Sequence, residues 1–153
     1  MTREEIAKTN LKKYEGLGRA IELQDLYFDI NEYAEDTIIT LDKAKSFAGQ
    51  DSAQAFQPET SYDGDLVSVI FTCDDAVLAH KVDYNDQQEV DALDAVKGED
   101  EYLVPAGTHF VVTDVSNEDD VEEMGYCEVS ISQLDDEEYQ EALEDGAKET
   151  HEI

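Results

Sequence analysis

An excess of acidic residues is the feature that most restricts what this chain can fold into. Forty Asp and Glu residues face ten Lys and Arg residues, which leaves a formal net charge of -30. Chains of such charge stay unfolded when Leu, Ile, Val and Phe together fall below about 20% of the residues. Here these four types supply 36 of 153 residues. We therefore expect a folded domain under an acidic surface, because a chain of this length buries roughly two thirds of its unfolded surface.

The charge also argues against several classes of function. An acidic surface repels phosphates, so we expect no direct binding to nucleic acid or to anionic lipid, and we expect basic partners. The chain has no apolar run near the roughly 18 residues of a membrane span and no signal-peptide core, which predicts a cytoplasmic protein of a host cell. Cys73 and Cys127 stand far apart without a C-x-x-C motif, which indicates two reduced core thiols and no metal site.

The acidic residues are unevenly distributed along the chain. Up to Gln50 there are 10 acidic and 7 basic residues, whereas 30 acidic and 3 basic residues follow it. Only 2 Pro residues are present, Gly is unclustered, and there is no repeat or linker of low complexity. We therefore predict one domain, residues 1–153, with a polarised surface.

Capping signals and apolar periodicity predict four helices. Thr2 and Glu5 form a capping box, Gly49 and Gly98 are placed to end helices, and Asp86 can cap another. The predicted helices are an N-terminal helix within 1–18, a helix over 41–48, a helix over 86–97, and a helix over 135–145 that opens a C-terminal acidic helix and tail, 135–153.

Alternating apolar patterns predict five strands, mostly in the second half of the chain. They cover residues 66–72, 76–84, 102–104, 109–115 and 126–134. The first two are expected to be neighbours, because only the turn-like Asp74-Asp75 separates them. The predicted class is α+β, a single domain with an antiparallel-rich twisted sheet and short flanking helices.

The segment from Gly98 to Val112, GEDEYLVPAGTHFVV, holds a Glu pair, a short apolar strand, a Pro/Gly-Thr turn and a second strand. It resembles the E-x-E region of ADP-ribosyltransferases of the bacterial exoenzyme type, and the resemblance extends over roughly residues 12–133. It implies that fold, with NAD as the cofactor. It also implies that Glu101 holds the nicotinamide ribose and stabilises the positive charge that develops there, while Glu99 orients the acceptor.

Two other motifs of that family are harder to place. A Tyr-Arg-Gly pattern normally supplies an arginine for the NAD pyrophosphate, whereas Tyr14-Glu15-Gly16 has an acid at that position. Arg19 can take the role only if the strand is shifted. The family's Ser-Thr-Ser motif cannot be recognised in the sequence, and Thr37 and Thr40 are the candidates for its role. The resemblance thus implies Arg19, Thr37 and Thr40 as cofactor-binding residues.

Other constellations are weaker. The alternating oxygens from Asp114 to Asp120 resemble a calcium loop, but that loop lacks its central Gly and its final Glu, so we expect no specific metal site. The three histidines, His80, His109 and His151, form no recognisable catalytic set by order or spacing, and we expect them to be structural.

Two functional hypotheses follow. In the favoured one, the protein comes from a phage or mobile element and inhibits a basic nucleic-acid-binding host protein, of restriction or CRISPR type, by nucleic-acid mimicry on a transferase-like scaffold; it then needs no cofactor. In the alternative, it is an active mono-ADP-ribosyltransferase that transfers ADP-ribose from NAD to a basic protein. Glu15 and the scarcity of cations favour the inhibitor, whereas the intact E-x-E pair favours the enzyme.

Either hypothesis uses an acidic docking surface. Adaptation to high salt is a third explanation of the acidity, but the 8 Lys against 2 Arg and the nearly balanced first 50 residues disfavour it. The predicted partner-binding residues are Asp114, Glu118, Asp119, Asp120, Glu122, Glu123, Asp135, Asp136, Glu137 and Glu138.

Overall fold

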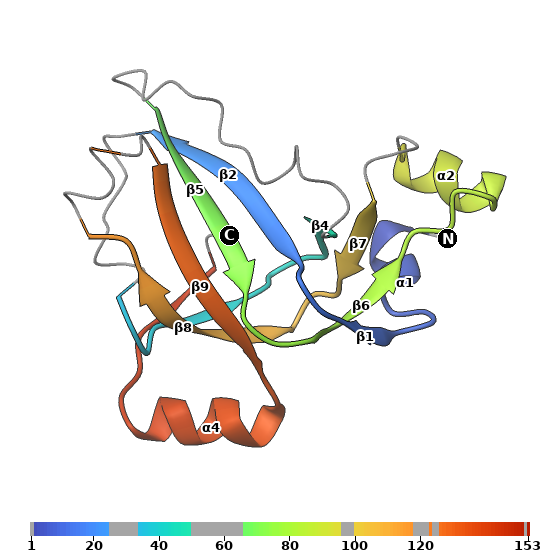
Figure 1. The fold of residues 1–153 in the computed structure, drawn as a ribbon. Coiled ribbons are helices and arrows are strands. Elements are labelled where there is room, and N and C mark those ends of the chain that lie inside the picture. Colours follow the sequence, from blue (N-terminus) through green and yellow to red (C-terminus); the bar gives the residue numbers. More distant parts are fainter. Residues whose placement is uncertain are drawn as a thin grey trace.

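The computed structural model describes residues 2–24, 34–49, 66–95, 100–117, 123, 126–151 and 153. They form a single α+β domain (Figure 1). In chain order the elements are α1 (Arg3–Ala7), β1 (Lys12–Tyr14), β2 (Gly18–Gln24), β3 (Ile38–Thr40), β4 (Lys45–Ala48), β5 (Leu66–Cys73), β6 (Val77–Lys81), α2 (Gln87–Leu93), β7 (Glu101–Val104), β8 (His109–Val115), β9 (Tyr126–Leu134), α4 (Asp136–Glu144) and β10 (Glu149–Thr150). None of the helices in these ranges has the length and apolar character needed to cross a membrane.

The strands form one ten-stranded sheet in the order β1-β6-β7-β4-β2-β5-β9-β8-β3-β10. The pairs are antiparallel except for β5 with β9 and β3 with β10. β2 and β4 pair through Gly18 and Ala48, and the sheet then folds back so that the Phe47 and Phe110 rings stack with centroids 5.9 Å apart. The predicted α+β class with an antiparallel-rich sheet is confirmed.

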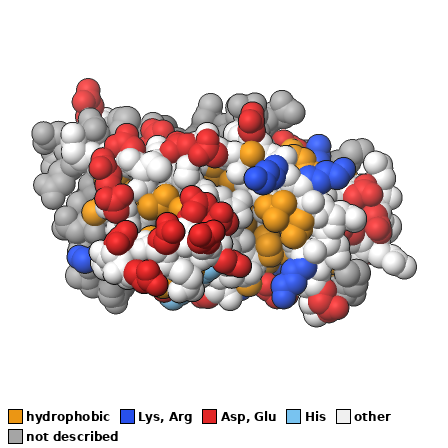
Figure 2. All heavy atoms as spheres, turned by 90° about the horizontal axis from the view of Figure 1, so that it is seen from below, with side chains coloured by type: hydrophobic (Ala, Val, Ile, Leu, Met, Phe, Trp, Pro, Cys, Tyr) orange, Lys and Arg blue, Asp and Glu red, His pale blue; other side chains and the backbone are white. Residues whose placement is uncertain are grey.

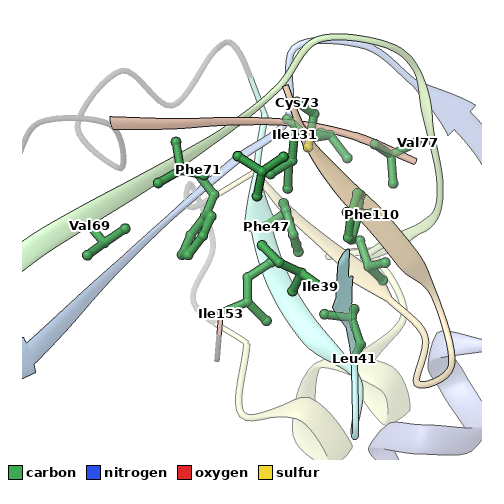
Figure 3. Close-up of a cluster of buried hydrophobic side chains, with 14 of the residues drawn as sticks. Ile39, Leu41, Phe47, Val69, Phe71, Cys73, Val77, Phe110, Ile131 and Ile153 are labelled. Carbon is green, nitrogen blue, oxygen red and sulfur yellow. The ribbon is translucent and has the colours of Figure 1, made fainter. Parts of the chain in front are cut away.

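Two apolar clusters hold the domain together. The main cluster fills the space between the two parts of the sheet and includes Phe47, Phe71, Phe110 and Ile153 (Figure 3). A smaller cluster lies under α1 and α2 and joins Ile6, Ala7, Ala44, Val82, Leu93 and Leu103.

Both cysteines are free and buried, as the sequence predicts. Burial raises the pKa of Cys73 to about 12 and that of Cys127 to about 11. Thiols with such pKa values stay protonated at neutral pH and are poor nucleophiles. The two residues therefore serve as core side chains.

The N-terminal helix is much shorter than predicted. The capping box of Thr2 and Glu5 is present, but the helix ends at Ala7 and the rest of the 1–18 segment forms β1 and the start of β2. Asn10 has φ 48 and Gly16 has φ 73, and these left-handed residues turn the chain twice. Pairing of β1 with β6 and of β2 with β5 therefore overrides the local helical pattern.

The helix predicted over 41–48 is wrong, because this segment holds β4. The spacing of apolar residues over 41–48 is typical of one helical stripe, but Ala44 belongs to the smaller cluster and Phe47 to the main one. The two side chains thus belong to different clusters, which a single helical stripe would not allow. Ladder pairing of β4 with β7, from Lys45↔Val104 to Ala48↔Glu101, decides the conformation.

The predicted pairing of 66–72 with 76–84 is also wrong. β5 pairs with β2 and β9, whereas β6 pairs with β1 and β7. The chain between them passes from one part of the folded sheet to the other. The remaining predicted strands and the helices α2 and α4 are confirmed within a few residues of their predicted ends.

Candidate functional site

The site begins with two neighbouring strands, β4 and β7. Ala48 lies opposite Glu101 in their antiparallel ladder, so Ser46 and Glu101 lie on the same face. The Ser46 hydroxyl donates a short hydrogen bond to Glu101 Oε1. Glu101 is only 9% exposed. A carboxylate in so little water acts more strongly on nearby charge than one on an open surface.

Arg19 enters the site from a third strand. β2 begins at Gly18, which pairs with Ala48, and Arg19 follows immediately. Its Nη1 donates to the Ser46 carbonyl oxygen at 3.0 Å. Burial lowers the pKa of Arg19, and the nearby charge of Arg3 lowers it further.

Arg19 also has an unused donor. Its Nε is buried without a hydrogen-bond partner, the single side-chain nitrogen or oxygen in that state within the described ranges. An unpaired buried donor costs about 1–3 kcal/mol, and such a group calls for an explanation such as a missing ligand. The chemistry of a guanidinium N–H indicates an anionic ligand, a phosphate or a carboxylate.

Further cations gather at the same place. Arg3 Nη2 donates to Ser46 Oγ at 2.7 Å, and its Nη1 lies 3.9 Å from Glu101 Oε1. The pKa of Lys45 is lowered first by burial and then by the positive charges of Arg19 and Lys43. This concentration of cations, in a chain of net charge -30, favours an anionic ligand.

The backbone around Glu101 is tightly held. Gly49 N donates to Asp100 O at 3.1 Å, and Glu101 N donates to Tyr84 Oη at 3.0 Å. A Cβ added at Gly49 would overlap the Asp100 carboxylate and lie 2.7 Å from Tyr102 Cε2. Position 49 therefore accepts only glycine without a shift of its neighbours, and the start of β7 is fixed against the end of β4.

The structure brings together only part of the site predicted from the sequence. Glu101 and Arg19 each bond Ser46, whereas Glu99 lies outside the described residues. Thr40 is the last residue of β3 and Thr37 immediately precedes this strand, and β2, β5, β9 and β8 separate β3 from β4 in the strand order. Thr37 is buried, and Thr40 bonds other residues of its own region.

Arg19 lies in strand β2, immediately after the residue that pairs with Ala48. Glu15 is exposed in the connection between β1 and β2, outside either strand. The acid that argued against NAD binding therefore lies outside the strands that carry Arg19, Ser46 and Glu101. Sequence reasoning missed Ser46 altogether, because the segment that holds it was predicted to be helical. The only local signal was a serine between Lys45 and Phe47, in a segment whose strand depends on pairing with the distant β7.

Four of the ten predicted partner-binding acids lie at the start of α4. Asp135 caps α4, and Asp136, Glu137 and Glu138 form its exposed first turn. Figure 2 looks at the face that α4 covers: acidic side chains crowd there, while Lys and Arg side chains gather at its other end. The other predicted acids are placed as follows: Asp114 and Glu123 are exposed, and Glu118, Asp119, Asp120 and Glu122 lie outside the described residues.

The histidines bond to structural partners. His80 is buried and its ring nitrogens lie 2.7 Å from Thr9 O and 2.8 Å from Glu89 Oε1. His109 stacks on Tyr139, with ring centroids 3.5 Å apart. In the part of the chain that the structure describes, no three His, Cys, Asp or Glu side chains converge as metal ligands.

The arrangement of the strands matches that of solved structures. The fold is that of the ADP-ribosyltransferases of the bacterial exoenzyme type. The Vis toxin, an ADP-ribosyltransferase from Vibrio splendidus, superposes with a TM-score of 0.55 at 14% identity, covering 91% of this chain and 55% of that chain. ADP-ribosyltransferase HopU1 of Pseudomonas syringae pv. tomato DC3000 gives 0.51 at 18% identity, covering 80% and 47%.

A third structure, the type III effector XopAI from Xanthomonas axonopodis pv. citri, gives a TM-score of 0.50 at 19% identity and covers 86% of this chain and 46% of that one. The chain thus spans about half the length of the structures it matches. No protein-family model and no curated protein matches its sequence.

Proposed function

We propose that this chain is a NAD-dependent mono-ADP-ribosyltransferase, the alternative of the two hypotheses. The observation that carries the proposal is the meeting of Arg19, Ser46 and Glu101 from three separate strands. Arg19 Nε supplies an independent test of fit, because this buried donor lacks a partner that an anionic ligand would provide.

Each residue then has a role. Bound NAD supplies the ADP-ribose, with nicotinamide as the leaving group. Arg19 holds the pyrophosphate, and Glu101 stabilises the positive charge that develops on the ribose as the bond to nicotinamide breaks. Ser46 holds the Glu101 carboxylate in place. The nucleophile, a side chain or water, gives up one proton as it bonds to the ribose.

Two arguments for the inhibitor lose their force. Glu15 is exposed outside the strands, so it does not oppose a phosphate at Arg19. Arg3, Arg19 and Lys45, three of the chain's ten cations, lie near one another beside Ser46. The inhibitor hypothesis itself, with its phage origin and its restriction or CRISPR target, stays a prediction.

Release of labelled nicotinamide from NAD tests the enzyme proposal, since water can act as acceptor. Glu101→Gln keeps the shape of the side chain but removes its charge, and we expect turnover to fall by about 10²-fold or more. Glu128→Gln, at an exposed position of β9, makes the same change of net charge and should leave turnover unaltered. Equal turnover in Glu101→Gln and the wild type, or no turnover and no NAD binding in the wild type, would refute the proposal.

We also propose that the acidic face of α4 docks on a basic protein, since exposed carboxylates gather there (Figure 2). Replacing Asp136, Glu137 and Glu138 by Asn and Gln removes three charges but keeps the capping residue Asp135. Binding to basic nucleic-acid-binding proteins should weaken and depend less on salt. Unchanged binding would refute the docking surface, and salt-dependent binding without any NAD turnover would favour the inhibitor.

A further inference from the structure

Helix α1 is fixed on the face of β4 and β7 that carries the site. Ile6 is buried in the same cluster as Leu103 of β7. Both carboxylate oxygens of Glu4 lie 3.0 Å from Ala44 N, which donates to them. Because Glu4 and Ile6 are both anchored, the backbone of Arg3 has a defined position beside Ser46.

Arg3 sets the direction of a chain of hydrogen bonds. Its Nη2 lies 2.7 Å from Ser46 Oγ, and a guanidinium can only donate. The Ser46 oxygen therefore accepts from Arg3, and its single proton is free to point at Glu101 Oε1, to which it donates. The chain of hydrogen bonds from Arg3 through Ser46 to Glu101 orients the Glu101 carboxylate. The Arg3 guanidinium itself lies 3.9 Å from Glu101 Oε1.

We infer that Arg3 is a positioning residue for Glu101, an inference that rests on the proposed transferase activity. Arg3 differs from Arg19 in what it touches. Arg19 bonds the backbone oxygen of Ser46 and keeps a buried donor unpaired, whereas Arg3 bonds the hydroxyl and lies against the carboxylate. Arg19 is thus placed to hold a ligand, and Arg3 is placed to hold a catalytic group.

This arrangement matters for the chemical step more than for binding. A carboxylate that must meet charge developing in the transition state is effective only when it is already oriented. Without Arg3 the Ser46 hydroxyl loses its fixed donor and can rotate its proton away from Glu101. Turnover then falls, while the contacts that hold the phosphates of NAD stay in place.

Steady-state hydrolysis of NAD by variants of the full chain tests the inference. For Arg3→Ala we expect kcat to fall by about 10- to 100-fold, the equivalent of one hydrogen bond to a charged group, with KM for NAD changed by less than about twofold. Arg3→Lys keeps a donor and a charge and should recover part of kcat. Guanidinium ion at millimolar concentration should raise kcat of Arg3→Ala but not that of the wild type.

Lys8→Ala is the matched control, because Lys8 is exposed at the end of the same helix and its loss changes the net charge equally. Its kinetics should equal those of the wild type. Thermal unfolding of every variant separates a loss of fold from a loss of orientation. If Arg3→Ala fails to fold, Arg3→Gln against Arg3→Lys gives the same comparison, with the larger loss of kcat expected in Arg3→Gln.

Two results overturn the inference alone: an unchanged kcat in a folded Arg3→Ala, or a rise in KM with kcat unchanged, which would make Arg3 a ligand-binding residue. In both, the wild type and Glu101→Gln still differ, so the proposed function stands. Absence of NAD turnover and NAD binding in the wild type overturns both proposals together.

Discussion

Truncation of Phe47 is expected to destabilise the domain severely. Phe47 is 2% exposed on β4 and stacks on the fully buried Phe110 of β8, so the pair joins the two parts of the folded sheet. Replacing a buried Phe by Ala costs about 3–5 kcal/mol through lost burial and the cavity that remains. Since the free energy of unfolding of a domain is about 5–15 kcal/mol, Phe47→Ala should remove a fifth or more of it.

Urea unfolding followed by circular dichroism and tyrosine fluorescence measures this loss, since the chain has 8 Tyr and no Trp. For a chain of this size each kcal/mol lowers Tm by roughly 2–4 °C, so Tm should fall by about 6–20 °C. Phe47→Leu keeps most of the apolar volume and is expected to cost less than about 1.5 kcal/mol.

A double-mutant cycle with Phe110→Ala isolates the contact between the two rings. Residues in contact show coupling energies of about 0.5–3 kcal/mol, so the double variant should lose less stability than the sum of the single losses. Additive losses, or a cost below about 1 kcal/mol for Phe47→Ala, would refute the conclusion that this pair joins the two parts of the sheet.

Three further predictions concern single positions. Gly49→Ala should destabilise by about 1–3 kcal/mol in thermal unfolding, because its Cβ overlaps the Asp100 carboxylate; an unchanged Tm would contradict the tight packing beside the site. Asp86→Ala removes the cap of α2 and should cost about 1 kcal/mol in urea unfolding, whereas Asp86→Asn should cost little; equal losses would contradict a capping role. The pKa of Glu149 is lowered by the hydroxyl groups that donate to it, and the pKa of His109 is lowered by burial. Each group therefore contributes stability at pH values above its unfolded pKa, near 4.5 for Glu149 and 6.5 for His109, and this stability is lost as the pH falls. Glu149→Gln should flatten the loss of stability below about pH 4.5 in urea titrations, and an unchanged pH profile would contradict this reasoning.

Local signals in the sequence predicted the elements whose conformation is decided locally. The capping box at Thr2 and the cap at Asp86 are both formed, and α4 begins within the segment 135–145 that was predicted to be helical. β8 and β9 also follow their alternating patterns, since each buries alternate residues against the main cluster. In these segments local propensity and long-range packing favour the same structure.

The site depends on pairings that no local pattern encodes. Ser46 and Glu101 are 55 residues apart in sequence, and the strand that holds Ser46 has four residues. An apolar residue every third or fourth position indicates a helix when read alone, and only the ladder with β7 gives β4 its extended form. The E-x-E segment was identifiable because its two strands are continuous in sequence, whereas the serine and the arginine come from separate strands.

The acidity of the chain and an anion-binding site are compatible because net charge does not set the local field. α4 packs against β9, and the acids of its first turn are exposed, so water and salt screen their field. Arg3 and Arg19, by contrast, touch Ser46 directly. A ligand at Glu101 is therefore acted on mainly by the nearby cations, and the exposed carboxylates of α4 act on what approaches that helix.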